Sequence, residues 1–268
     1  MTAEPSQPSQ PSEPGKILRL LVVCPNWVGD AVMATPALRL LRDALPGAFI
    51  GGFLRPGIDQ ILADAGLFDE IHVERAHGVM GPKYAAAKLR PRHYDTALLL
   101  TNSFRTALTT RIAGIPRRVG YDRDGRGLLL TDRFKLPTRP DVSLPQRLGQ
   151  ARFAALPAVH AYWALAAGLL DRQETELPEG TLPTLGTSDR DEAHADELLE
   201  HLGRTPFAVL VPGGSKPPKR WPADRFGALA EHLSSAHGLA VLASGSPAEA
   251  DVLGAVAEAG PARPITTP

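Results

Sequence analysis

The stretch Ile17–Leu38 reads ILRLLVVCPNWVGDAVMATPAL and joins a short apolar run to an amphipathic segment. A short apolar run rich in Leu and Val is typical of a buried strand, and apolar residues at helical spacing follow from Ala31. A buried strand followed directly by an amphipathic helix is typical of a βαβ unit. The stretch therefore predicts an open α/β sheet, with one acid, Asp30, at the turn where its first strand gives way to its first helix.

The same alternation continues along the chain, which predicts a parallel sheet covered on both faces. In the first half we expect strands at Ile17–Cys24, Ala48–Phe53, Glu70–Val73 and Thr96–Leu100. The expected helices are Ala31–Leu45, Gly57–Ala65, Gly81–Arg90 and Ser103–Ala113, with a later helix interrupted at Pro157. In the second half we expect helices Asp189–Leu202, Pro222–His237 and Ala248–Ala259, and two strands, Phe207–Val211 and Leu239–Ala243.

The composition of the chain divides it into three parts. Residues 1–15 are rich in Pro, Ser and Gln and are predicted to be a disordered tail. A Pro/Gly/Thr-rich connection then separates a domain over 16–176 from a second domain over 177–268. Doubly wound sheets usually have about five or six strands, so two strands leave the second domain incomplete. We therefore expect the chain to be truncated at its C-terminus, either as a fragment of a longer protein or as a naturally shortened gene product.

Charge and cysteine usage narrow the class of protein. Lys plus Arg number 29 and Asp plus Glu number 29, so the whole-chain charge gives no reason to propose nucleic-acid binding. The single cysteine fits a reducing compartment and is expected to be a packing residue. No apolar run approaches the roughly 20 residues of a membrane-spanning helix, and the N-terminus does not resemble a signal peptide. The expected location is the cytoplasm.

Asp30 has two interpretations that the pattern alone does not separate. An Asp at the start of a helix is often an N-cap whose carboxylate binds free backbone amides. Alternatively, a carboxylate at the ligand-binding edge of an open sheet can act as a general base, with Gly29 leaving its approach uncrowded.

A second motif, VPGGSKPPKRWP at Val211–Pro222, lies between a strand and a helix. Its glycines allow close backbone approach to a phosphate, and its hydroxyl and cationic side chains add donors beside a helix N-terminus. The motif is neither a Walker loop nor a dinucleotide fingerprint. The alternative is a solvated basic turn.

An arginine-rich region runs from Thr101 to Pro140. Nine Lys or Arg residues against three Asp give it a local net charge of +6. Such a patch suits an anionic partner or an acidic membrane surface, although an ordinary solvated face is equally compatible with it. The eight scattered His residues and the lone cysteine give no metal-ligand spacing, so no metal site is expected.

Three pieces of sequence resemble a known family. These are NWVGDAVMATPAL, YDTALLLTNSFRTALTTRIAGIPRRVGY and PGGSKPPKRWPADRFGALAEHL. The chain resembles the ADP-heptose:lipopolysaccharide heptosyltransferases of glycosyltransferase family 9, and most closely the heptosyltransferase II branch. The resemblance implies a GT-B fold, in which two Rossmann-like domains carry the acceptor and the nucleotide sugar. It implies inverting transfer of heptose from ADP-heptose to the anionic inner core of lipopolysaccharide, without metal or cofactor, in peripheral contact with the inner membrane.

The resemblance also assigns roles to residues. Asp30 is implied to be the general base that deprotonates the acceptor hydroxyl. The implied donor-phosphate ligands are Lys219, Ser215 and Gly214, and the implied acceptor ligands are Asn102, Ser103, Arg105, Arg117, Arg118 and Arg123. A later Asp-Ser/Thr-Gly-x-x-His motif of the family is missing from this chain. Two alternatives follow: a non-catalytic glycolipid-binding module, or a family 9 transferase that uses another nucleotide sugar.

Overall fold

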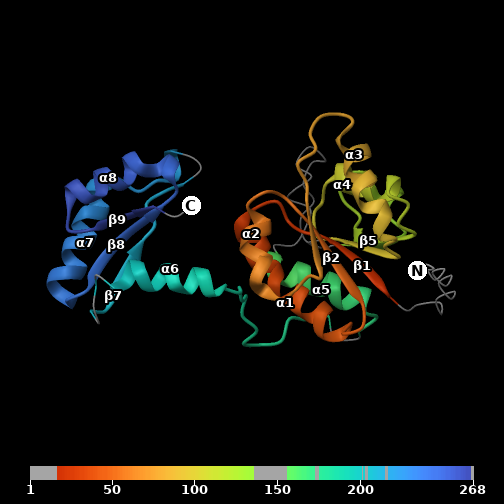
Figure 1. The fold of residues 1–268 in the computed structure, drawn as a ribbon, viewed down its shortest axis with the longest axis horizontal. Helices are drawn as coiled ribbons and strands as arrows, with labels where there is room; N and C mark the ends of the chain where they lie inside the picture. Colours follow the sequence, from red (N-terminus) through yellow and green to blue (C-terminus); the bar gives the residue numbers. More distant parts are fainter. Residues whose placement is uncertain are drawn as a thin grey trace, which may run out of the picture. The chain divides into compact units, whose positions relative to one another are not determined.

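The computed structural model describes residues 17–135, 156–172, 175–200, 202, 205–214 and 217–266 (Figure 1). The chain divides into two compact units, residues 1–188 and 189–268. This division falls later than the boundary expected after Glu176, because the segment that follows packs on the first unit. The backbone N–H of Thr184 donates to Thr35 Oγ1 at 3.0 Å, and Gly186 lies against the backbone of Asp64. The predicted tail lies outside the described residues.

The first unit is built on a six-stranded sheet whose paired strands all run parallel. Its strands are β1 (Arg19–Val23), β2 (Phe49–Leu54), β3 (Glu70–Val73), β4 (Thr96–Leu99), β5 (Arg117–Tyr121) and β6 (Asp132–Phe134). They lie in the order β3-β2-β1-β4-β5-β6, which is the order of doubly wound nucleotide-binding sheets. The predicted α/β class is thus confirmed.

Helices cover both faces of this sheet. They are α1 (Val28–Ala44), α2 (Ile58–Leu62), α3 (Gly81–Leu89), α4 (Phe104–Ile112) and α5 (Ala158–Leu169). Successive side chains of a strand point to opposite faces, so Leu20 and Val22 of β1 join one core with α1, α2 and α5. Leu21 and Val23 join a second core with α3 and α4. Burial on both faces explains why β1 reads as a continuous apolar run.

Strands β5 and β6 correct the sequence-based expectation, which had four strands in this half. The motif RRVGY reads as polar because β5 begins with two arginines. Arg118 is nevertheless buried, and its guanidinium donates to the carbonyls of Leu129, Ile115 and Pro116 at 2.6–2.9 Å. Part of the arginine-rich region is therefore structural rather than a cationic patch.

Pro157 is the N-cap of α5, where a missing N–H breaks no helical hydrogen bond. The helix expected before it lies outside the described residues. Another proline, Pro36, lies inside α1 and cannot donate to the carbonyl of Val32. The Thr35 hydroxyl donates to that carbonyl instead, at 2.8 Å, which allows α1 to continue.

The second unit contains a three-stranded parallel sheet in the order β7-β8-β9. Its elements are α6 (Asp189–Glu200), β7 (Phe207–Leu210), α7 (Ala223–His237), β8 (Ala240–Gly245), α8 (Ala250–Ala259) and β9 (Arg263–Thr266). Its core joins α7 and α8 to one face of the sheet, while Phe207 and Val209 of β7 remain exposed. The expectation of two clear strands is corrected by β9. This strand begins with Arg263 and contains Pro264, so it does not read as an apolar run.

Candidate active site

The carboxyl ends of β1 and β4 form the edge where the first sheet is open to a ligand. These two strands are neighbours, and the helices that follow them lie on opposite faces of the sheet, α1 on one and α4 on the other. Such a topological switch point leaves a crevice at the strand ends. Asp30 follows β1, and Asn102 and Ser103 follow β4. The structure therefore brings these three predicted site residues to one edge.

Asp30 is the third residue of α1, not its N-cap. The helix begins at Val28, and the N-cap position is held by Trp27, without a side-chain capping hydrogen bond. The N-cap interpretation of Asp30 is therefore wrong. The side chain is partly exposed, and the partial positive charge of the helix N-terminus favours a negative charge in the first turn.

A tyrosine of α5 contacts this carboxylate. Helix α5 packs on α1, and its Tyr162 hydroxyl is hydrogen-bonded to Asp30. Burial raises the pKa of Tyr162 far above its usual value, and the charge of Asp30 and the hydrogen bond with it raise that pKa further. The phenol is therefore a neutral donor that orients the carboxylate. The sequence pattern gave no signal for Tyr162, because AYW inside an apolar helix is typical of ordinary packing.

A fully buried arginine, Arg126, holds the loop that follows β4. Its Nε donates to the Tyr121 carbonyl at 3.0 Å, one terminal nitrogen donates to the Thr101 carbonyl, and the other donates to Asn102 Oδ1 at 3.2 Å. Burial lowers the pKa of Arg126 to about 10, against the opposing charges of Asp124 and Asp122.

With Oδ1 engaged by Arg126, the Asn102 amide is left to present its Nδ2 donors. In the sequence, Arg126 is only one of the nine cations of the arginine-rich region. The segment around it, RDGRG at Arg123–Gly127, is polar and gave no signal that Arg126 is buried.

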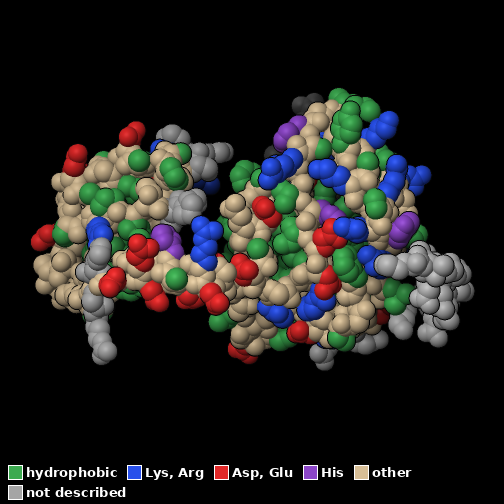
Figure 2. All heavy atoms as spheres, in the orientation of Figure 1, with side chains coloured by type: hydrophobic (Ala, Val, Ile, Leu, Met, Phe, Trp, Pro, Cys, Tyr) green, Lys and Arg blue, Asp and Glu red, His purple; other side chains and the backbone are tan. Residues whose placement is uncertain are grey.

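Arg105 also has a structural role. Its guanidinium donates to the carbonyls of Ala76 and Gly78, the latter at 2.9 Å, and pairs with Glu74 at 3.4 Å. These contacts hold the loop between β3 and α3 against α4. On the face drawn in Figure 2, Lys, Arg and His side chains gather with hydrophobic ones around the loop that leads into α3.

The three remaining arginines fall at opposite edges of the sheet. Arg117 and Arg118 begin β5, whose parallel register pairs them with Thr96 and Ala97 at the start of β4. They therefore lie toward the amino ends of the strands, away from Asp30. Arg123 follows the carboxyl end of β5 and lies 3.8 Å from the Asp124 carboxylate, at the same edge as Asp30.

The glycine-rich loop of the second unit lies at the carboxyl end of β7. The Gly214 carbonyl accepts from Arg220 Nε at 2.9 Å, and Lys219 is exposed at the end of the short 3-10 helix Pro217–Lys219. Ser215 lies outside the described residues. Arg220 is thus held against Gly214, and phosphate binding by this loop stays a prediction.

Glu249, which was not among the predicted site residues, contacts this loop. Its carboxylate accepts from the Ser246 N–H and hydroxyl at 2.8–2.9 Å and from the Gly214 N–H, and these hydrogen bonds lower its pKa. A side chain at Gly213 would collide with it. The S-x-x-E spacing of a capping box was the available signal.

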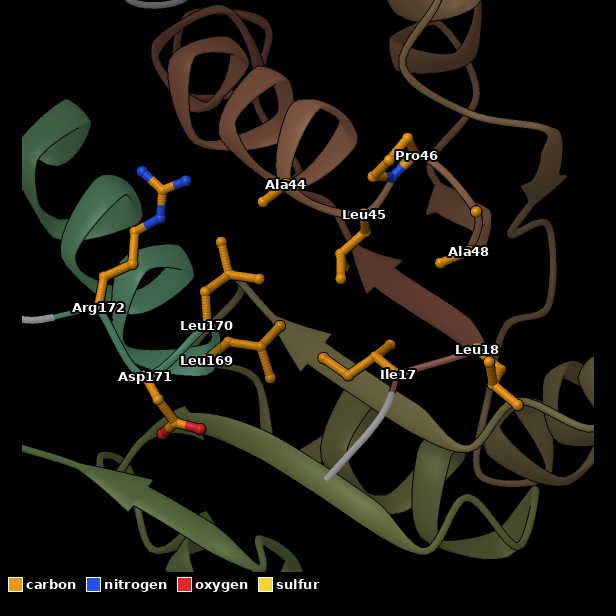
Figure 3. A pocket seen from close by; sticks show the side chains of 11 residues that line it. Ile17, Leu18, Ala44, Leu45, Pro46, Ala48, Leu169, Leu170, Asp171 and Arg172 are labelled. Carbon is orange, nitrogen blue, oxygen red and sulfur yellow. The ribbon is translucent and has the colours of Figure 1, made fainter. Parts of the chain in front are cut away.

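A cavity of about 660 Å³ lies at the other edge of the first sheet (Figure 3). It is lined mostly by apolar side chains from the end of α1, the start of β1 and the end of α5, including Leu45, Ile17 and Leu169. It is therefore remote from the strand ends that carry Asp30.

The described part of the chain lacks both a metal-binding cluster and a membrane-spanning helix. No group of three or more His, Cys, Asp or Glu side chains there could hold a metal ion. No helix there is long and apolar enough to cross a membrane. Cys24, the lone cysteine, is buried, and burial raises the pKa of its thiol far above the usual value, as expected for a packing residue.

These features define a two-unit α/β protein with a carboxylate at the switch point of its first sheet and a glycine-rich cationic loop in its second. The chain belongs to glycosyltransferase family 9 (heptosyltransferase), whose family model matches residues 85–263. The predicted family and the GT-B fold class are thus confirmed.

The curated proteins that the chain matches in sequence include heptosyltransferases. The chain is 29% identical to lipopolysaccharide heptosyltransferase 2 of Escherichia coli K12 over 81% of its own length and 60% of that protein. It is 26% identical to lipooligosaccharide heptosyltransferase 2 of Haemophilus influenzae over 85% of its length and 64% of the relative. The chain thus spans about three fifths of the length of these curated relatives.

Solved structures share the fold. ADP-heptose lipopolysaccharide heptosyltransferase II of E. coli is 25% identical, with a TM-score of 0.70 over 93% of this chain and 72% of that one. A family 9 glycosyltransferase of Veillonella parvula is 21% identical, with a TM-score of 0.75 over 93% of this chain and 68% of that one.

Proposed function

We propose that this chain carries the acceptor site and part of the donor site of an inverting glycosyltransferase that moves heptose from ADP-heptose to the inner core of lipopolysaccharide. The observation that carries the proposal is the place of Asp30: a partly exposed carboxylate at the switch point, oriented by Tyr162. The names of the relatives, lipopolysaccharide heptosyltransferase 2 and ADP-heptose lipopolysaccharide heptosyltransferase II, support the choice of donor and acceptor.

In the proposed reaction, an acceptor hydroxyl oxygen attacks the anomeric carbon of the donor heptose. Its proton passes to the Asp30 carboxylate, and the bond from the anomeric carbon to the phosphate oxygen breaks. ADP leaves with that electron pair, and the anomeric configuration inverts. Lys219 would offset the charge that develops on the leaving diphosphate.

Acceptor recognition is assigned to the residues at the same edge as Asp30. Asn102, held by Arg126, and Ser103 supply hydrogen-bonding groups, and Arg123 supplies a cation for the anionic acceptor. Arg105 acts indirectly, by holding the loop before α3. The proposed site does not include Arg117 or Arg118, which lie at the amino ends of the strands. We place the protein at the cytoplasmic face of the inner membrane, where such an acceptor would be presented.

The test measures heptose transfer from ADP-heptose to heptose-free lipopolysaccharide core. Asp30→Asn should lower kcat/KM by about 10²- to 10⁴-fold, the usual contribution of a general base, without loss of folded structure by circular dichroism. The matched control is Asp43→Asn, which changes an exposed acid at the other end of the same helix. Substantial turnover by Asp30→Asn would remove Asp30 from the role of base. Acceptor binding by the native chain without any transfer would favour the non-catalytic module.

The donor loop is tested by ADP binding. Lys219→Ala should weaken the affinity for ADP about tenfold, since a cation beside a diphosphate is lost. Arg225→Ala, which removes an exposed cation from α7 in the same unit, is the control. Equal ADP affinity in all three proteins would contradict the assignment of Lys219.

A further inference from the structure

The loop between β3 and α3 ends in a turn with an unusual pair of residues. The Gly81 N–H donates to the Gly78 carbonyl at 3.2 Å, so Val79 and Met80 are the two central residues of a β-turn. Central turn positions are usually taken by Gly, Pro, Asn, Asp or Ser. Here the side chain of Val79 is 97% exposed and that of Met80 is 48% exposed. The turn therefore presents two apolar side chains outward.

Helix α3 extends this apolar tip with a mixed face. Lys83, Tyr84, Ala87 and Lys88 are exposed, whereas Ala85, Ala86 and Leu89 are buried against the sheet. Lys83 and Ala87 are four residues apart, as are Tyr84 and Lys88, so the four side chains share one face of the helix. The exposed face is thus cationic and aromatic, next to the apolar tip.

The charge of this region has one sign. From Arg75 to Tyr94 the sequence contains five Lys or Arg residues and no Asp or Glu. Arg92 is paired with Glu70 and Arg90 donates to the carbonyl of Ile112, which leaves Arg75, Lys83 and Lys88 as exposed cations around the turn. Figure 2 shows hydrophobic and cationic side chains gathered over this part of the first unit.

The tip is held in place before any partner binds. Arg105 holds the backbone at Ala76 and Gly78, and the N–H groups of Lys83 and Tyr84 donate to the Met80 carbonyl. These hydrogen bonds engage the carbonyls of Ala76, Gly78 and Met80, which removes part of the cost of moving the backbone of the turn into an apolar environment. A rigid loop also loses little conformational entropy on binding.

We propose that Val79, Met80 and Tyr84, ringed by Arg75, Lys83 and Lys88, form a docking surface for an anionic phospholipid bilayer. The apolar side chains enter the headgroup boundary while the cations contact lipid phosphates, a combination of apolar area and charge that interfacial segments share. This inference rests on the proposed function, in which a lipid-linked acceptor is presented at a bilayer. The docking surface is the part of the first unit that would contact that bilayer.

The test uses vesicle flotation with no lipopolysaccharide present. The chain should float with vesicles of phosphatidylglycerol and phosphatidylcholine and remain behind with phosphatidylcholine alone. Val79→Ser with Met80→Ser should lower partitioning at least tenfold. Lys83→Gln with Lys88→Gln should lower it about fivefold per cation removed, and this second effect should shrink at high salt.

Matched controls distinguish vesicle binding through this turn from non-specific hydrophobic or electrostatic binding. Leu182→Ser removes another exposed apolar side chain of the first unit, and Arg133→Gln removes another exposed cation; both should float like the native chain. In addition, Val79→Trp should show a blue-shifted emission and quenching by brominated lipid on anionic vesicles, and Leu182→Trp should show neither.

Any of four results would overturn the proposal. The chain does not float with anionic vesicles, or it floats equally well with neutral vesicles. Alternatively, the Val79/Met80 variant floats like the native chain, or the native chain floats only when lipopolysaccharide is added. The last would assign the surface to the acceptor rather than to the bilayer. Because the vesicles contain neither donor nor acceptor, failure here leaves the transfer assay of Asp30→Asn unaffected, and failure of that assay leaves vesicle binding standing.

Discussion

The Tyr162 hydroxyl on α5 hydrogen-bonds the Asp30 carboxylate on α1, and this carboxylate adds to the effect of burial in raising the pKa of the phenol. The two lie far apart in the sequence and meet only because α5 packs on α1. The carboxylate gains a fixed orientation at the switch point. The phenol is held neutral because it is buried, and because ionising it would place a second negative charge beside Asp30.

This pair predicts a change in tyrosine titration. Burial is the main cause of the raised pKa of Tyr162, and the charge of Asp30 is the next. Asp30→Asn should therefore lower the pKa of Tyr162 while leaving it above the ordinary value of about 10. Ultraviolet absorbance of tyrosinate measures it, and Tyr162→Phe identifies which of the four tyrosines is responsible. An unchanged titration curve in Asp30→Asn would contradict the contact.

Tyr162→Phe should slow transfer without preventing acceptor binding. A hydrogen bond to a charged group contributes about 1.5–3 kcal/mol, so loss of carboxylate orientation should lower kcat by roughly 10- to 100-fold while KM for the acceptor changes little. Steady-state kinetics separate the two parameters. Tyr84→Phe, at an exposed position on α3, is the control. An increased KM with normal kcat would show that Tyr162 binds the acceptor instead.

Arg126→Met should destabilise the first unit and disorder the loop after β4. It leaves the carbonyls of Tyr121 and Thr101 and the Asn102 amide without their donor, at about 1–3 kcal/mol for each buried unsatisfied group. Urea unfolding measures the loss, and Arg133→Met, at an exposed position of β6, should cost less than about 0.5 kcal/mol. Equal unfolding midpoints for the two variants would contradict the role of Arg126.

Arg105→Ala should loosen the loop before α3. The guanidinium holds two backbone carbonyls and Glu74, so its loss should raise amide hydrogen exchange across 75–81 by about 10-fold or more, the equivalent of roughly 1.4 kcal/mol. Arg111→Ala changes an exposed arginine of the same helix and should leave this exchange unchanged. Matching exchange rates in the native protein and Arg105→Ala would rule out the bracing role.

The stability of the first unit should fall in alkali. Tyr121 donates to the Ala161 carbonyl at 2.7 Å, and burial raises its pKa to about 12 from about 10 in the unfolded chain. The neutral phenol is favoured in the fold, so its stabilising contribution is complete below about pH 10 and is lost as the pH rises toward about 12. The free energy of unfolding, measured by urea titration, should decrease over that interval.

Tyr121→Phe isolates this contribution. The variant should lose about 1 kcal/mol at neutral pH with its hydrogen bond and should then show a shallower alkaline decrease than the native chain. Tyr84→Phe should keep the native slope. Identical alkaline slopes in Tyr121→Phe and the native chain would assign the decrease to other groups.

The sequence by itself determined the α/β class and the position of Asp30. Apolar runs such as Leu20–Val23 have only one stable environment in water, the interior of a sheet covered on both faces. The strand-to-helix step then places the acid at the strand's carboxyl end. The glycines and cations of Val211–Pro222 predicted a phosphate-binding loop from the sequence pattern. The family resemblance added the proposed role of Lys219 within it.

Only the tertiary structure decided which polar residues meet. Strand order placed Asn102 at the same edge of the sheet as Asp30, and Arg117 and Arg118 at the other edge. Packing of α5 on α1 brought in Tyr162, and burial made Arg126 a structural donor rather than a surface charge. These relations depend on contacts between segments distant in the chain. Periodicity reports which face of an element is buried, whereas the partner on that face depends on how the whole sheet is assembled.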